Sequence, residues 1–440
     1  MASTLTANSG KFNKQTAIAV IVANMIGTGV FTSLGFQLLD IQSGFVILML
    51  WLVGGVTALC GALSYAELGA AFPRSGGEYN FLNEIYHPLA GFVSGWISAT
   101  IGFAAPTALA AITFGKYFTS VYPQFSSSWL ACGLIVVLTL VHASTRRNSG
   151  QLQSVFTILK ILLIVVFCVL CWLLVDEPQP INFLPAEGDK ALMFSGAFAV
   201  SLIYVNYAYS GWNAATYLSS ELEDPKKNLP IILGIGTAIV ILMYLALNFT
   251  FLYVAPVESM QGQIEVGYIA AQSVFGPSGA AIMGVSLSLL LISTVSAMII
   301  AAPRVLQMIG EDFSAFRFLG KTNQHGIPAN AIYTQSGISL LFILTGTFEE
   351  ILIFAGFALG LNTFMAVLGV FILRWRQPDI ERPYKTWAYP LTPIIFLSLT
   401  GWTLVYLLID KPKESFTSLG IIFIGIIFYF VSRAFSTIKP

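Results

Sequence analysis

The chain is a succession of long apolar runs separated by short polar segments. Each run is close to the length, about 20 residues, that an α-helix needs to cross a bilayer. The pattern predicts an all-α membrane protein with about twelve transmembrane helices in one membrane domain. A less apolar, amphipathic stretch, residues 256–276, is expected to form an outer loop with a short helix. The expected spans are residues 16–39, 43–70, 89–117, 128–145, 151–175, 191–220, 229–255, 278–303, 329–346, 349–374, 387–409 and 416–434.

The first apolar run is interrupted in its middle by the sequence Ile-Gly-Thr-Gly-Val, residues 26–30. Two glycines beside a threonine weaken a helix, and lipid cannot satisfy the backbone groups that a break sets free. The half-helix after the break directs bare N–H groups toward the midplane, which suits a carboxylate. The half-helix before it ends in bare carbonyls, which suit an ammonium. An amino acid carries both groups, so the break predicts a transporter with a site for a zwitterion.

A second interruption lies in the sixth span, between Tyr207 and Asn213. The two interrupted spans are five apart and therefore cross the membrane in opposite directions. Paired breaks of this kind are typical of transporters built from inverted repeats, although glycine also serves close helix packing alone. The predicted organisation is a cytoplasmic tail (1–15), a transporter core (16–374) with repeats at about 16–175 and 191–374, and two appended helices (387–434).

Composition and charge agree with this interpretation. Of the 440 residues, 56% are hydrophobic and 10% are charged, and the mean hydropathy is +0.79; soluble proteins are about 25% charged. With the N-terminus inside, sixteen of the 21 Lys and Arg residues lie on the cytoplasmic side, four lie outside and Lys160 lies within a span. Because cations gather on the cytoplasmic side, both termini are expected in the cytoplasm, with the chain in the cell membrane. The polar segment Met1 to Gln15 does not have the pattern of a signal peptide.

Other chemistry finds little support in the sequence. The four cysteines all lie in predicted spans, and for Cys168 and Cys171 simple helix packing competes with a redox or metal role. Three scattered histidines have no metal-binding spacing, and neither a complete nucleotide-binding Gly-x-x-x-x-Gly-Lys-Ser/Thr motif nor a Ser/His/Asp cluster is present. Basic patches with interleaved aromatic residues, as nucleic acid requires, are absent as well. We therefore expect no enzyme, no cofactor, no metal and no nucleic-acid partner.

Four motifs together resemble the amino acid–polyamine–organocation superfamily. They are Gly27-Thr28-Gly29, the loop Phe72 to Tyr79 (FPRSGGEY), the stretch Tyr209 to Asn213 (YSGWN) and the run Glu221 to Pro230 (ELEDPKKNLP). The order of residues in the sixth span is most similar to the L-type amino acid transporter family and its bacterial relatives. The resemblance extends over nearly the whole chain. It implies a five-plus-five inverted repeat with broken helices 1 and 6, alternating access, and sodium-independent movement of amino acids, often by exchange.

The resemblance also implies binding roles. The substrate carboxylate is expected at the N–H groups of residues 28–30, and the substrate ammonium at carbonyls of Ala23 or Ile26 and near Tyr207 and Ser210. Tyr207 stands where many relatives have Phe, so its phenol adds a hydrogen-bonding group to the gate. Trp212 is either a substrate contact or ordinary bundle packing. The candidate substrate-binding residues are Ala23, Ile26, Gly27, Thr28, Gly29, Val30, Tyr207, Ser210, Gly211 and Trp212.

Lys160 is the one full charge deep in a predicted span, nine residues from Gln151. That is about 13 Å along a helix at about 1.5 Å per residue, and an intramembrane charge is a functional hypothesis by default. Lys160 is either a fixed cation, replacing the sodium ion that related transporters hold between spans one, five and eight, or a carrier of the coupling proton. It could also point into a polar crevice with no part in transport. Ser293 and Ser296 in span eight are its candidate partners, unless their hydroxyls bond to their own helix.

The leading hypothesis is a sodium-independent exchanger of neutral L-amino acids. The predicted midplane holds no Asp or Glu, which argues against a cationic substrate, and Tyr207 favours small side chains by narrowing the pocket. A proton-coupled symporter using Lys160 and a non-transporting amino acid sensor are the alternatives. Eukaryotic relatives often pair with a glycoprotein through a cysteine after span three. Residues 119–128 contain no cysteine, so we expect no disulfide-linked accessory subunit, and only the lipid bilayer and a small amino acid as partners.

Overall fold

The computed structural model describes residues 14–436 apart from residues 73, 75, 145–149, 214, 215, 217–221, 302, 313–315 and 325. Most of the predicted N-terminal tail, two residues of the FPRSGGEY loop and Glu221 therefore lie outside the described residues. The helices are α1 (Lys14–Met25), α2 (Gly29–Gln37), α3 (Gly44–Ala71), α4 (Glu78–Ile85), α5 (Pro88–Ile97), the π-helix η1 (Ser98–Gly102), α6 (Ala104–Val121), α7 (Ser127–Ser144), α8 (Gly150–Leu174), α9 (Asp189–Met193), α10 (Gly196–Tyr209), α11 (Pro225–Val254), α12 (Val257–Met260), α13 (Val266–Ala301), α14 (Pro303–Asp312), α15 (Arg317–Gly320), α16 (Ala329–Thr345), α17 (Phe348–Arg376), α18 (Leu391–Asp410) and α19 (Pro412–Ser436).

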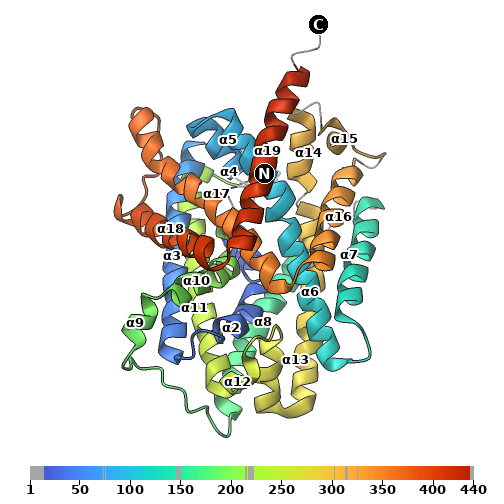
Figure 1. The fold of residues 1–440 in the computed structure, drawn as a ribbon, viewed down its shortest axis with the longest axis vertical. Coiled ribbons are helices and arrows are strands. Elements are labelled where there is room, and N and C mark those ends of the chain that lie inside the picture. Colours follow the sequence, from blue (N-terminus) through green and yellow to red (C-terminus); the bar gives the residue numbers. More distant parts are fainter. Residues whose placement is uncertain are drawn as a thin grey trace, which may run out of the picture.

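The fold is that of an all-α, multi-pass membrane protein, as the apolar runs predicted. Within the described residues, ten helical stretches are long and apolar enough to cross a membrane. The shorter α10 and α16 correspond to the predicted sixth and ninth spans. The connecting helices α4, α14 and α15 lie near one end of the bundle, and α12 lies at the opposite end (Figure 1). The stretch predicted as an outer loop holds α12 and the part of α13 that precedes a kink at Gly276, where φ is 67°.

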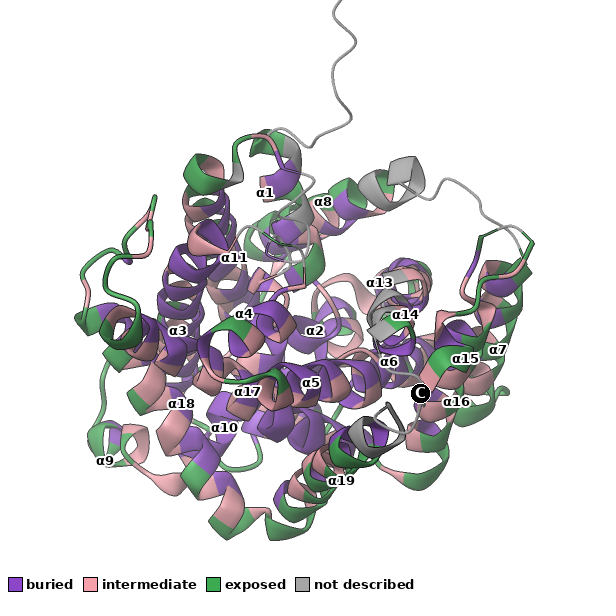
Figure 2. Cartoon of the chain, turned by 90° about the horizontal axis from the view of Figure 1, so that it is seen from above, coloured by how far each residue is buried: buried purple, intermediate pink, exposed green. Residues whose placement is uncertain are grey.

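Burial is arranged around a central group of helices. Figure 2 shows buried residues concentrated in the middle of the bundle, in α2, α3, α10 and α17, whereas the rim carries most of the exposed positions. The exposed side chains on the rim are largely apolar: Leu173 of α8 is 73% exposed and Ile158 is 65% exposed. In a soluble protein such a surface would be an aggregation hazard, but hydrocarbon is the solvent here. A polar site therefore lies inside the bundle and not on its rim.

Both predicted helix breaks are present, and they pack against each other. The first separates α1 from α2 at residues 26–28, and the second ends α10 at Tyr209. A Cβ added to Gly29 would lie 2.5 Å from the Cα of Ala208, so only glycine allows this approach. Gly211 has φ of +99°, and a Cβ there would lie 2.8 Å from the carbonyl oxygen of Asn24. The two glycines thus permit the contact that creates the central site.

A buried ionic cluster connects helices at one end of the bundle. Glu67 of α3 is 0% exposed and accepts two hydrogen bonds from the guanidinium of Arg374, at 2.9 and 2.7 Å. The same carboxylate accepts from the backbone N–H of Thr386 at 2.6 Å and from its hydroxyl at 2.7 Å. Arg374 also lies over the ring of Tyr389, 3.6 Å from its centre. These contacts join α3, α17 and the segment that follows α17, and they satisfy a carboxylate that would otherwise be costly to bury.

Toward the opposite end, aromatic rings of α2, α10 and α17 stack on one another. The ring of Phe36 on α2 lies between Tyr204 of α10 and Phe348 of α17, with ring centres 5.7 and 5.6 Å apart. The hydroxyl of Tyr204 donates to Glu349 at 2.9 Å, and Lys411 contacts the same carboxylate at 3.0 Å. The stack therefore covers one side of the region where the two breaks meet.

Candidate functional site

A small cavity lies where the two broken spans meet α6, α8 and α13. Its free volume is about 50 Å³, and one water occupies about 30 Å³ in the liquid. The α1–α2 break supplies seven of the fifteen lining residues, and the end of α10 supplies three more. The lining residues are Ala23, Asn24, Met25, Ile26, Gly27, Thr28 and Gly29 from the first break, Pro106 from α6, Lys160 from α8, Tyr207, Ala208 and Ser210 from the second break, and Thr294, Ala297 and Met298 from α13.

The first break presents backbone groups of both polarities to this cavity. Because α2 begins at Gly29, its first N–H groups have no preceding helical turn to accept them. Thr28 is the N-cap residue, and its side chain makes no capping hydrogen bond to those groups. The positive end of the α2 dipole therefore faces the cavity with donors available for an anion. On the other side of the break, α1 ends at Met25 and leaves carbonyl groups near the same space.

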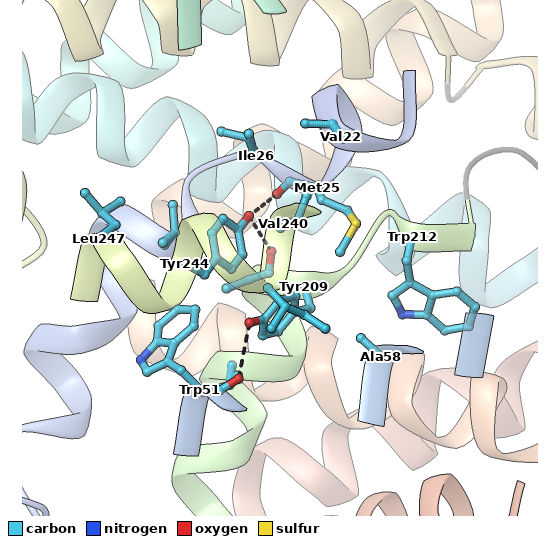
Figure 3. Packing of buried hydrophobic residues seen from close by; sticks show 14 of the residues in the cluster. Val22, Met25, Ile26, Trp51, Ala58, Tyr209, Trp212, Val240, Tyr244 and Leu247 are labelled. Atoms are coloured by element: carbon cyan, nitrogen blue, oxygen red, sulfur yellow. Dashed lines mark hydrogen bonds between the residues drawn. The ribbon is translucent and has the colours of Figure 1, made fainter. Parts of the chain in front are cut away.

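The hydroxyl of Tyr244 on α11 holds the carbonyl sides of the two breaks together. It lies 2.5 Å from the carbonyl oxygen of Met25 and 3.0 Å from that of Ala208 (Figure 3). The indole of Trp51 packs edge-on against the Tyr244 ring at 5.6 Å, and the Tyr209 hydroxyl donates to the Trp51 carbonyl at 3.2 Å. Sequence reasoning missed Tyr244, since a tyrosine within an apolar span carries no signal of the direction in which it points.

Lys160 reaches the cavity from α8 and is 7% exposed. Its ammonium donates to the hydroxyl of Thr294 on α13 at 2.8 Å. Of the two serines expected as its partners, Ser296 is hydrogen-bonded to His142 Nε2 at 2.8 Å, and Ser293 is not among the residues that line the cavity. Thr294 belongs to the same Ser-Thr-Val-Ser stretch, but helical spacing alone favours the pair of serines over it. Among the described residues that line the cavity, Lys160 carries the only full charge.

Tyr207 joins the two breaks on the polar side of the cavity. Its hydroxyl lies 3.2 Å from the hydroxyl of Thr28, and its carbonyl accepts from the Ser210 hydroxyl at 2.6 Å. Three other predicted residues do not line the cavity. Val30 and Gly211 flank it. Trp212 packs edge-on against Tyr65 of α3, with ring centres 4.7 Å apart. Residues that sequence reasoning missed are Asn24, Met25, Pro106, Ala208, Thr294, Ala297 and Met298.

These features define a class of protein. A multi-pass helical bundle with a polar cavity at two facing helix breaks, flanked by bare helix ends of both polarities, is a membrane transport protein. The chain belongs to the amino acid permease family, whose sequence model matches residues 12–432. It is accordingly an amino acid transporter and not an enzyme.

Individual relatives narrow the likeness to the L-type branch. The chain is 27% identical over 426 residues to the mouse b(0,+)-type amino acid transporter 1, covering 94% of this chain and 86% of that protein. It is 28% identical over 424 residues to the human large neutral amino acids transporter small subunit 2, covering 94% and 79%. The mouse Asc-type amino acid transporter 1 is 28% identical over 436 residues, with the same coverage. These matches confirm the resemblance that the motifs indicated.

Proposed function

We propose that the protein is a sodium-independent exchanger of neutral L-amino acids. The single observation that carries the proposal is the position of Lys160, whose ammonium lies 2.8 Å from the Thr294 hydroxyl on the wall of the cavity between the two breaks. A protonated lysine at this point supplies a positive charge beside the carbonyl end of α1. A transporter that carries its own cation there has no need to recruit one with each cycle.

The cavity binds both ends of a zwitterion. The substrate carboxylate accepts from the N–H groups of residues 28–30 at the start of α2, with the helix dipole behind them. The substrate ammonium donates to carbonyls at Ala23 and Ile26, because Tyr244 already occupies the Met25 carbonyl. The described lining residues include no carboxylate to pair with a cationic side chain, which supports a neutral substrate. The name of one relative, the large neutral amino acids transporter small subunit 2, points in the same direction.

Transport proceeds by alternating access between two inverted repeats, at about residues 16–175 and 191–374. Each repeat contributes one broken span to the cavity, and the breaks share contacts at Gly29–Ala208 and through Tyr244. A conformational change that opens the site to one side must therefore move both breaks together. This coupling supports exchange, because the empty site keeps polar backbone groups that a returning substrate satisfies.

A second candidate is proton-coupled symport through Lys160. The partner of Lys160 favours this candidate, because it is a neutral hydroxyl. Without a paired carboxylate to stabilise the ammonium, deprotonation of the lysine costs less free energy. An amino acid sensor that binds without transporting would share the same cavity, and a flux measurement separates it from both transporters.

The test is uptake of radiolabelled L-alanine and L-leucine into sodium-free proteoliposomes, with and without internal amino acid, at two pH values. Uptake that requires internal amino acid and ignores a proton gradient is the result expected for the exchanger. Uptake into empty vesicles driven by an inward proton gradient would replace the exchanger with the symporter. Saturable binding without uptake would identify a sensor.

The proposal includes a location in the cell membrane with both termini in the cytoplasm, as the distribution of Lys and Arg favours. It also includes function without a disulfide-linked subunit. Cys60, Cys168 and Cys171 are buried, and Cys132 lies within α7, so none of the four presents a thiol in an exposed loop. Reconstitution of the purified chain alone tests this point, since activity without any added protein is expected.

A further inference from the structure

We infer that the hydroxyl pair of Thr28 and Tyr207 selects substrates that carry a side-chain hydroxyl over apolar substrates of the same size. The inference rests on the proposed function and names the substrate class of that same cavity. It makes serine and threonine the preferred substrates, ahead of their apolar counterparts 2-aminobutyrate and valine.

The pair is built from the two breaks and is held away from water. Thr28 precedes α2 and is 3% exposed, whereas Tyr207 lies near the end of α10 and is 8% exposed. Their hydroxyl oxygens are 3.2 Å apart, and both residues line the cavity. Two hydroxyls from separate half-helices therefore meet at the place where the substrate binds.

One of the two hydroxyl hydrogens in this pair has no acceptor within the pair. Two hydroxyls carry two hydrogens, and a single hydrogen bond between them uses one. Within the described part of the chain, the pair has no other hydrogen-bond partner to accept the second hydrogen. Thr32, one turn further on, donates to the backbone carbonyl of Thr28 and not to its hydroxyl. The remaining O–H group is buried at the cavity wall, where a donor without an acceptor costs free energy.

The oxygen of a substrate hydroxyl accepts the hydrogen bond that this donor lacks. The hydrogen of the substrate hydroxyl is in turn donated to the oxygen of Thr28 or Tyr207. An ethyl group in the same place fills the space but leaves the donor unpaired. Serine and threonine carry a hydroxyl on Cβ, where 2-aminobutyrate and valine carry a methyl group.

The experiment compares isosteric competitors. Proteoliposomes loaded with L-alanine take up labelled L-alanine in the presence of serine or 2-aminobutyrate, and the ratio of their inhibition constants is measured. Serine and 2-aminobutyrate have the same number of heavy atoms, so the ratio reports the hydroxyl alone. We expect serine to inhibit about tenfold better in the unaltered protein, and the ratio to approach one in Tyr207→Phe and in Thr28→Val.

The matched control is Tyr204→Phe. It removes a phenol from the same half-helix, but that phenol donates to Glu349 and does not line the cavity. The ratio should stay near tenfold in this variant. The readout is a ratio, so a change in the overall rate of any variant does not alter it. For a variant too slow to assay, the thermal stabilisation that each ligand gives the purified protein provides the same ratio.

Two results overturn the inference. One is equal inhibition by serine and 2-aminobutyrate in the unaltered protein, and the other is a preference for serine that survives both Tyr207→Phe and Thr28→Val. Failure of the proposed function looks different, because L-alanine would then not exchange at all in the unaltered protein.

Discussion

Substituting Gly29 by alanine tests the contact on which the central cavity depends. The added Cβ would lie 2.5 Å from the Cα of Ala208, 2.7 Å from its Cβ and 3.0 Å from its backbone nitrogen. Ordinary van der Waals contact begins at 3.4 Å, so the two breaks must separate by about 0.9 Å. The atoms in the way belong mainly to the backbone and to a Cβ, so a change of side-chain rotamer cannot relieve the clash.

Overpacking in a well-packed interior costs about 1–3 kcal/mol, and a clash between backbones belongs at the upper end. A penalty of about 3 kcal/mol in the state that brings the breaks together corresponds to roughly a hundredfold in its population, since about 1.4 kcal/mol is tenfold. L-alanine exchange should fall by a similar factor, and the thermal unfolding temperature of the purified protein should fall by several degrees.

Gly27→Ala is the matched control. It makes the same chemical change two residues earlier, yet the nearest atom to the added Cβ is the Met25 carbonyl oxygen at 3.9 Å. We expect its unfolding temperature to remain within about 1 °C of the unaltered protein, because the added methyl group meets no clash. Equal unfolding temperatures for Gly29→Ala and Gly27→Ala would refute the steric argument and the close packing of the two breaks.

Three further substitutions test individual polar contacts in the bundle. Tyr244→Phe leaves two buried carbonyls without their hydroxyl donor, so stability should fall by about 1–3 kcal/mol and exchange should slow; an unchanged unfolding temperature would contradict the bridging role. Glu67→Gln removes the charge that pairs with Arg374 and should cost about 3 kcal/mol in thermal or denaturant unfolding, whereas a loss below about 0.5 kcal/mol would show that the cluster is dispensable. Lys413→Ala breaks only an exposed ion pair and should leave the unfolding temperature unchanged, so any clear drop would point to a structural role at that end.

Most of the fold could be predicted from the sequence because the bilayer limits the possibilities. Apolar runs of spanning length allow little besides transmembrane helices, and the structure has helices where the twelve runs lie. The break at residues 26–28 was predictable as well, because glycines beside a polar residue in mid-membrane interrupt a helix that lipid would otherwise keep intact. The wall of the cavity that the first break supplies was largely predicted for the same reason.

Contacts between spans were harder to predict, because periodicity does not fix the rotation of a helix that is apolar on all sides. Lys160 was identified from its charge, yet its contact with Thr294 depended on the orientation of α13, and helical spacing favoured the neighbouring serines instead. Tyr244 was missed for the same reason. For Trp212 the sequence left substrate contact and bundle packing open; in the structure it packs on Tyr65, next to the turn at Gly211. Tertiary packing, which the local sequence does not encode, decided each of these.

The central claim is that an amino acid crosses the membrane only in exchange for another, with Lys160 in place of a recruited ion. The most direct measurement uses two labels in sodium-free vesicles with no pH gradient: ³H-alanine outside and ¹⁴C-alanine inside, counted together over time. We expect one labelled molecule to leave for each one that enters, and this ratio to stay the same when sodium is added. Entry without matching exit, or exchange that appears only with sodium or a proton gradient, would contradict it.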